Sequence, residues 1–233
     1  MLEVPSYTAV EFLRGEIGAS SAKARDLKNK IMFLRHALNS EGRLLQEIVA
    51  IDIRTRTTSW AKQTLKYMGT MGWSIEQIKS LGLCNIEKSI NDWDTLKWTE
   101  GMQSKSTLRL YRSSKDKPEE IRWFRNGFKY SLMLKARSDS LKLGWRGLRE
   151  DKSKDCKLCG FDSETLEHFL IDCPALQAIR NKEIILQLPR IESKEVIMKV
   201  FLLMKVEPDV STQGLIDTLL QLWNTRDRIM SAV

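Results

Sequence analysis

The chain contains, at residues 156–174, the sequence CKLCGFDSETLEHFLIDCP. This stretch places Cys156, Cys159, His168 and Cys173 at the spacing C-x2-C-x8-H-x4-C. Zinc in proteins takes four thiolate or imidazole ligands in a tetrahedron, and two cysteines two residues apart can hold one edge of it in a tight turn. Gly160 lets the chain turn directly after the second cysteine without a Cβ clash. The spacing predicts one zinc ion, and four protein ligands leave no open position for water, so the predicted role is structural.

Other interpretations of these residues are weaker. Cys156 and Cys159 have the spacing of a redox pair, but the strand-to-helix unit that carries such pairs in thioredoxin-like folds is not visible in the sequence. A disulfide is disfavoured because we expect an intracellular chain. Cys84 stands alone in LGLCNIEK and is predicted to be a buried thiol rather than a ligand. Glu164 and Glu167 could support the ligand His168, although we expect them to match the dipole of a helix N-terminus instead.

Helical periodicity surrounds the motif and extends along almost the whole chain. Asp162 or Ser163 can cap a helix that ends near Cys173, because Pro174 disfavours helical geometry at the residue before it. Ser20 or Ser21 can cap the helix that carries one apolar stripe at residues 27, 31, 34 and 38. A long helix over residues 43–68 is expected to bury Leu44, Leu45, Ile48, Ile51 and Trp60. Further helices are predicted near residues 8–18, 74–81, 86–111, 129–137, 175–188, 193–204 and 212–230.

No run of residues alternates with the period of two that marks a half-buried strand beyond four or five positions. The predicted fold class is therefore all-α and multi-helical, with a small CCHC zinc knuckle inserted between helices and at most a short hairpin at the cysteine pair. We divide the chain into a helical region at 1–104, a basic helical segment at 105–154, the zinc-binding knuckle at 155–190 and C-terminal helices at 191–233.

The charge is concentrated in the second of these segments. The whole chain has 38 Lys+Arg, 30 Asp+Glu and a net charge of +8. Residues 105–154 alone hold 15 Lys+Arg and 6 Asp+Glu, a net charge of +9, whereas residues 1–104 carry +2 and residues 155–233 carry −3. A block of this kind indicates a polyanionic partner. The candidate phosphate contacts are Lys105, Arg109, Arg112, Arg122, Arg125, Lys129, Lys135, Arg137, Lys142 and Arg146.

Four aromatic residues, Trp123, Phe124, Tyr130 and Trp145, are interleaved with these cations. Some could stack on unpaired bases, but packing in the core is the better interpretation for most of them. Alternation of basic and apolar residues is also what any amphipathic helix shows. The alternative function is therefore a structural or protein-interaction scaffold that the zinc ion holds together. In that case the basic face contacts solvent and has no direct role in binding nucleic acid.

Composition excludes several classes of protein. The chain has 233 residues, 42% of them hydrophobic and 29% charged, which is ordinary globular usage and excludes a wholly disordered chain. No stretch approaches the roughly 18 uncharged apolar residues of a membrane span. The first residues, MLEVPSYTAVEFLRGE, carry acids and no apolar core of a secretory leader. We expect the nucleus or cytoplasm, without secretion and without a membrane partner.

The motif at residues 156–174 resembles the zinc-binding region near the C-terminus of reverse transcriptases from non-LTR (LINE-type) retrotransposons. The similarity extends to KSTLRLYRSSK at 105–115 and YSLMLKARSDSLKL at 130–143, which resemble the segments before that region in arthropod-type elements. LEVPSYTAVEFLRGEIG at 2–18 resembles the stretch that follows the polymerase domain. The resemblance implies Cys156, Cys159, His168 and Cys173 as zinc ligands, RNA or DNA as partner, and association with the polymerase domain of the same element.

The catalytic residues of such an enzyme are not found in this sequence. The polymerase needs a Tyr-x-Asp-Asp type of metal site, and the chain has no Asp-Asp pair. There is also no Gly-rich phosphate loop, no nucleophile–base pair at a recognisable spacing and no indication of a small-molecule substrate. We therefore expect no enzyme activity, and we expect a module that grips element RNA or target DNA for a polymerase.

Overall fold

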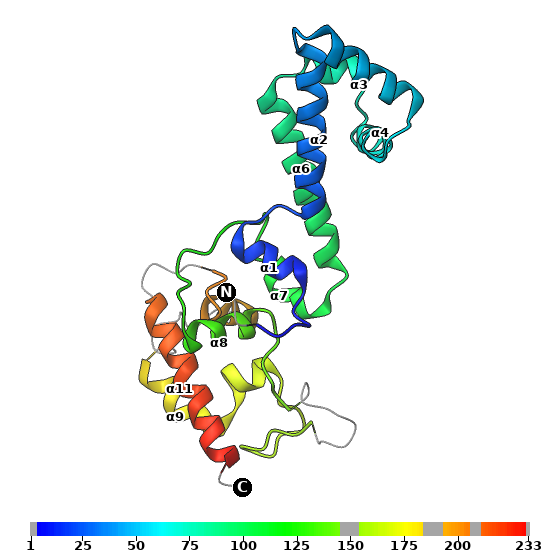
Figure 1. Ribbon diagram of the computed structural model, residues 1–233. Helices are drawn as coiled ribbons and strands as arrows, with labels where there is room; N and C mark the ends of the chain where they lie inside the picture. The colour runs from blue at the N-terminus through cyan, green and yellow to red at the C-terminus, as the bar shows by residue number, and fades with distance from the viewer. Residues whose placement is uncertain (1–3, 145–153, 184–192, 206–210, 232–233) are drawn as a thin grey trace. The chain divides into compact units, whose positions relative to one another are not determined.

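The computed structural model describes residues 4–144, 154–183, 193–205 and 211–231 (Figure 1). These residues form helices, turns and loops, and no strand occurs among them. The mostly helical structure agrees with the predicted all-α class. The chain divides into two compact units, which we describe separately: unit 1 comprises residues 1–18 and 99–233, and unit 2 comprises residues 19–98. The basic segment and the zinc motif both fall in unit 1. None of the described helices is long and apolar enough to cross a membrane.

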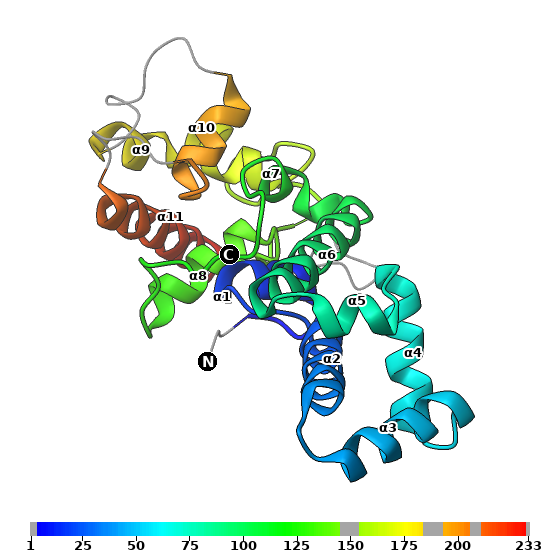
Figure 2. The same cartoon turned by 90° about the horizontal axis from the view of Figure 1, so that it is seen from above.

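Unit 2 is a set of helices packed around α2 (Figures 1 and 2). The helices are α2 (Ala22–Asn39), α3 (Arg43–Thr55), α4 (Ser59–Met71), α5 (Ile75–Ser80) and the greater part of α6 (Leu83–Gln103). Ser21 caps α2 by accepting the N–H of Ala24, and Ser74 forms a capping box with Gln77 at the start of α5. The predicted stripe of α2 is confirmed at Leu27, Ile31 and Leu34, each fully buried. The predicted cap at Ser20 or Ser21 and this stripe are local signals, which explains why the sequence indicated them.

The predicted long helix over residues 43–68 is wrong. Arg56 adopts a left-handed conformation and Thr58 starts a new helix, so α3 and α4 are separate. The side chain of Asp52 accepts hydrogen bonds from Thr57 and Thr58, and the hydroxyl of Thr58 accepts the N–H of Ala61. A turn made from Asp and Thr side chains breaks the helix without Gly or Pro.

The buried face of α3 also differs from the prediction. Leu44, Ile48 and Ile51 are exposed, whereas Val49 and Ile53 are buried. Apolar residues lie on several sides of this helix, so periodicity alone did not select the side that packs on α2 and α4. Cys84, predicted as a buried thiol, is exposed near the start of α6. It lies in unit 2 and has no part in the zinc motif.

Unit 1 contains the remaining elements. They are α1 (Val10–Ile17), the last residues of α6, the 3₁₀ turn η1 (Ser106–Leu108), α7 (Arg109–Arg112), α8 (Phe128–Arg137), the π-helix η2 (His168–Asp172), the 3₁₀ turn η3 (Pro174–Leu176), α9 (Gln177–Glu183), α10 (Lys194–Phe201) and α11 (Thr212–Ser231). Helix α8 lies alongside α11 (Figure 1). The core joins apolar residues of these two helices to Phe169, Leu170 and Leu176 around the zinc motif. The motif is therefore part of the core of this unit.

A buried ionic network centred on Glu16 joins α1 to α7 and α8. The fully buried carboxylate of Glu16 receives two hydrogen bonds from the guanidinium of Arg137, at 2.9 and 3.0 Å. Tyr111 donates its hydroxyl at 2.7 Å and Lys115 its ammonium at 3.1 Å. Arg137 also donates to the backbone carbonyls of Leu202 and Leu203. Its charge is compensated inside the unit, so Arg137, which the sequence places among the phosphate contacts, is buried and paired with Glu16.

Candidate metal centre

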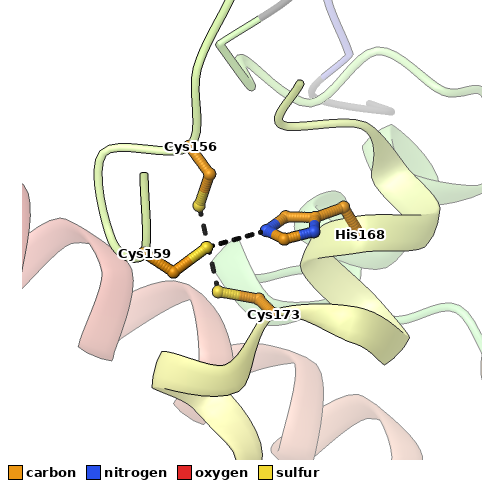
Figure 3. Close-up of side chains that lie close together, drawn as sticks. All are labelled: Cys156, Cys159, His168 and Cys173. Atoms are coloured by element: carbon orange, nitrogen blue, oxygen red, sulfur yellow. Dashed lines mark hydrogen bonds between the residues drawn. The ribbon is translucent and has the colours of Figure 1, made fainter. Parts of the chain in front are cut away.

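Three thiols and one imidazole converge at one point of unit 1 (Figure 3). The ligand atoms of Cys156, Cys159, His168 and Cys173 all lie within 4.8 Å of one another. Cys156 Sγ is 3.8 Å from Cys173 Sγ, and Cys159 Sγ is 3.3 Å from His168 Nε2. A zinc tetrahedron with Zn–S bonds of about 2.3 Å has S···S edges of about 3.8 Å and S···N edges of about 3.6 Å. The four ligand atoms are therefore close enough to bind a metal ion.

The first two ligands lie on a tight turn. Gly160 donates its N–H to the carbonyl of Cys156 at 2.7 Å, and Cys156 donates its own N–H to the carbonyl of Phe161 at 2.7 Å. Gly160 has φ +76°, a left-handed conformation that a side chain would strain, so the predicted use of this glycine is confirmed. The turn presents both cysteine side chains to the same side, as Figure 3 shows.

The other two ligands lie at the ends of a π-helical turn. Cys173 donates its N–H to the carbonyl of His168, five residues earlier, at 2.7 Å. In a regular α-helix, residues five apart point about 140° away from one another. The wider π turn reduces this angle, and it brings the side chains of His168 and Cys173 to one side of the chain. The x4 spacing between these ligands is therefore matched by a local change of helix type that the sequence did not predict.

Burial shifts the pKa values of Cys156, His168 and Cys173. Burial and the neighbouring Cys156 raise the pKa of the Cys173 thiol to about 12, and burial raises the pKa of Cys156 as well. Burial lowers the pKa of His168, which keeps its imidazole neutral at pH 7 and able to bind a metal. Because a metal binds thiolates, loading this site must release protons from the cysteines. Metal binding is consequently expected to weaken as the pH falls.

Phe161 covers one face of the histidine ligand. Its ring is parallel to the imidazole of His168 within 6°, with ring centroids 4.8 Å apart. The side chain of Phe161 is itself 55% exposed. The stacking fixes the plane of the imidazole, so that Nε2 stays directed toward the thiol of Cys159.

Glu164 has a structural role that the sequence did not indicate. Its carboxylate is buried and accepts two hydrogen bonds from Arg226 on α11, at 2.6 and 2.8 Å. It also accepts the N–H of Gly144 at 2.6 Å. A Cβ at Gly144 would lie 2.9 Å from the carbonyl oxygen of Lys154 and 3.2 Å from the Cβ of Glu164, so only glycine fits there. The predicted match of Glu164 to a helix dipole is wrong, and no spacing rule could have linked it to a residue 62 positions away.

The candidate phosphate contacts occupy three environments. Arg137 is buried, Lys129 and Lys135 are half-buried, and Arg146 lies outside the described residues. Lys129 forms an ion pair with Asp217 at 2.9 Å, and Arg109 forms one with Glu195 at 3.2 Å. The exposed members of the set are Lys105, Arg109, Arg112, Arg122, Arg125 and Lys142.

Two of the three described interleaved aromatic residues pack against the core, as the sequence predicts for most of the set. Trp123 and Tyr130 pack against the core of unit 1, and the ring of Phe124 lies edge-on to that of Tyr130 at 6.3 Å. The guanidinium of Arg137 lies 5.4 Å from the ring of Trp123. Trp145 lies outside the described residues. The described members of the four, Trp123, Phe124 and Tyr130, therefore contact other side chains of unit 1, whereas Phe128 in the same segment is 52% exposed.

Comparison of the chain with protein-family models, with curated proteins and with solved structures finds no match.

Proposed function

We propose that this chain is a zinc-binding module that grips RNA or DNA through its basic segment. We further propose that it corresponds to the post-polymerase region of a non-LTR retrotransposon reverse transcriptase, acts by binding rather than catalysis, and serves the polymerase domain of the same element. The observation that carries the proposal is the convergence of Cys156, Cys159, His168 and Cys173 inside the unit that also holds the basic segment.

The choice of zinc rests on the donor set. Three sulfurs and one imidazole nitrogen are soft or borderline ligands, which zinc prefers and which magnesium and calcium do not. Four protein ligands would leave no position for a reactive water, so the ion would hold structure rather than perform hydrolysis. In this proposal the zinc ion fixes the turn at 156–160 to the π turn at 168–173. The core of unit 1 is then closed around the metal.

The binding surface for nucleic acid is proposed from cations that the fold does not use. Six cations of the basic segment are exposed and have no side-chain hydrogen bond or ion pair in the described part of the chain: Lys105, Lys117, Arg122, Arg125, Lys142 and Lys154. Exposed cations that lack a neighbouring acid attract phosphates without first breaking an ion pair. Glu16, Asp217 and Glu195, in contrast, already compensate Arg137, Lys129 and Arg109. The proposed surface is therefore narrower than the basic segment as a whole.

A scaffold without a nucleic-acid partner remains the second candidate. It is favoured by the ion pairs just named, because they show that part of the basic segment stabilises unit 1. The two candidates differ in what the six unpaired cations do. In a scaffold they would only keep the surface soluble.

Charge reversal at three unpaired cations separates these candidates. The variant Arg122→Glu, Arg125→Glu, Lys142→Glu is expected to bind labelled RNA and DNA more weakly than the unaltered chain, whatever the base sequence. If six cations meet phosphates, the slope of log K against log salt is about −4 on single strands and about −5 on duplex, and the variant should lose about half of it. Fluorescence anisotropy at several salt concentrations measures both quantities.

The matched control reverses three exposed lysines of unit 2 that contact no described acid, in the variant Lys62→Glu, Lys66→Glu, Lys88→Glu. It changes the net charge by the same amount and is expected to leave most of the affinity and the slope. Equal losses in the two triple variants would show that binding depends on net charge alone and would refute the proposed surface. Weak binding in both, independent of salt, would support the scaffold.

A further inference from the structure

A buried cation lies directly beside the metal ligands and pairs with no carboxylate of the described side chains. Arg180, on α9, is 1% exposed and is among the largest fully buried side chains of the molecule. Its guanidinium donates to the backbone carbonyls of Phe169 and Cys173 and to the side-chain oxygen of Gln177. All three acceptors are neutral, and Nε of Arg180 has no hydrogen-bond partner among the described residues. A buried guanidinium with only neutral acceptors is costly unless an anion lies nearby.

Described acids near the site do not supply this anion. Asp172 attracts the charge of Arg180 but is exposed, and it pairs with Lys194 at 2.9 Å. Glu164 is buried but already holds Arg226 through both of its oxygens. Glu167 is 3.6 Å from the ammonium of Lys194. Among the described side chains, therefore, no carboxylate compensates the charge of Arg180.

The charge of the proposed metal centre has the required sign and size. A divalent ion bound by three thiolates and one neutral imidazole carries a net charge of −1. This charge would be delocalised over the sulfurs of Cys156, Cys159 and Cys173, two of which belong to buried residues. Arg180 hydrogen-bonds the backbone of one of these ligands, Cys173, and of Phe169 within the π turn. The centre and Arg180 together are neutral.

We propose that Arg180 is the counter-charge of the metal–thiolate centre and that it raises the affinity of the site for a divalent soft ion. This inference rests on the proposed zinc site and adds a residue that is not a ligand. Arg180 acts through the ligands. Its positive charge stabilises the negatively charged metal–thiolate complex, and its guanidinium group holds the backbone carbonyls of Phe169 and Cys173 at the two ends of one helical turn. Residues that support metal ligands in this way commonly contribute about 10- to 100-fold in affinity.

The test compares two substitutions that differ in charge but both retain hydrogen-bond donors. Arg180→Gln removes the charge, whereas Arg180→Lys keeps it. Zinc affinity of the full chain is measured by competition with a chromophoric chelator. Arg180→Gln is expected to weaken zinc binding by about 10- to 100-fold, and Arg180→Lys by less than about tenfold. Faster alkylation of the thiols in the zinc-loaded Arg180→Gln chain provides a second readout.

Lys194→Met is the control, because Lys194 is an exposed cation that pairs with Asp172 and Glu167 beside the same ligands. Solvent screens its charge, so the zinc affinity should change little. Equal losses in Arg180→Gln and Arg180→Lys, or unchanged affinity in Arg180→Gln, would overturn the role of charge at Arg180. An unaltered chain that binds no zinc would instead refute the metal centre itself, so the two failures are distinguishable.

Discussion

Removal of the metal from the full chain is expected to unfold unit 1 and to leave unit 2 folded. Cys156 and Cys173 are members of the core of unit 1, so the turn, the π turn and the helices that pack on them depend on the centre. Structural zinc sites contribute apparent binding energies of about 10–16 kcal/mol at pH 7, which appear as folding energy. Hydrogen exchange followed by mass spectrometry resolves the two units separately. Protection should be lost over residues 128–144 and 154–183 after chelation and retained over α2 to α5.

Two cysteine variants provide the matched comparison. Cys159→Ser removes one ligand and should reproduce the loss of protection in unit 1 without any chelator. Cys84→Ser makes the same chemical change at an exposed cysteine of unit 2 and should have no such effect. Unchanged protection of unit 1 in Cys159→Ser would contradict the structural role of the centre.

Loss of the buried carboxylate of Glu16 should produce the second large effect. Glu16→Gln keeps the shape of the side chain but leaves the charge of Arg137 without its buried partner, and Lys115 without its carboxylate. Breaking a buried ion pair on one side typically costs about 3–5 kcal/mol. Thermal or urea unfolding of unit 1 in the zinc-loaded chain, followed by circular dichroism, measures the loss. Glu47→Gln removes the acid of an exposed pair with Arg43 and should be almost neutral.

The same network gives unit 1 a defined pH dependence. Burial alone would raise the pKa of Glu16, but the guanidinium of Arg137 and the ammonium of Lys115 outweigh it and lower the pKa below its usual value of 4.5. A carboxyl group with a lowered pKa stabilises the fold at pH values above about 4.5 and loses this contribution as the pH falls further. Acid also releases metal from thiolates. The relevant quantity is therefore the difference in the free energy of unfolding between the unaltered chain and Glu16→Gln. This difference should stay constant above pH 4.5 and shrink below it. A difference that stays constant at lower pH would contradict this account.

The sequence predicted those features that depend on neighbouring residues. The ligand spacing in 156–174, the cap at Ser20 or Ser21 and the helix at 129–137 are all local signals. The structure contains the ligand cluster, a cap at Ser21 and a helix over Phe128–Arg137. The helix at 43–68 was wrong because the break at Arg56 depends on side-chain hydrogen bonds of Asp52 rather than on Gly or Pro. Residue spacing shows where helical faces repeat. It does not show that side-chain hydrogen bonds will stabilise a turn in the middle of an apolar pattern.

The sequence did not predict the ion pairs between residues that are far apart in the chain. The sequence places Arg137 among the phosphate contacts, because no local pattern links it to its partner Glu16, which is 121 residues away. Glu164 and Arg226 are separated by 62 residues, and Arg180 is recognisable as a buried cation only once the π turn has placed its acceptors. A positive charge has the same appearance in a sequence whether it faces solvent or a buried carboxylate. The structure therefore narrowed the proposed nucleic-acid surface to cations without a partner.

The metal content of the purified chain tests the central claim most directly. Elemental analysis and native mass spectrometry should find one zinc ion for each chain, in the unaltered protein and in Cys84→Ser, and almost none in Cys159→Ser. The thiols at Cys156, Cys159 and Cys173 should resist alkylation only while the ion is bound. An unaltered chain that contains no zinc and takes up none from solution, or a Cys159→Ser chain that retains a full equivalent, would contradict the account.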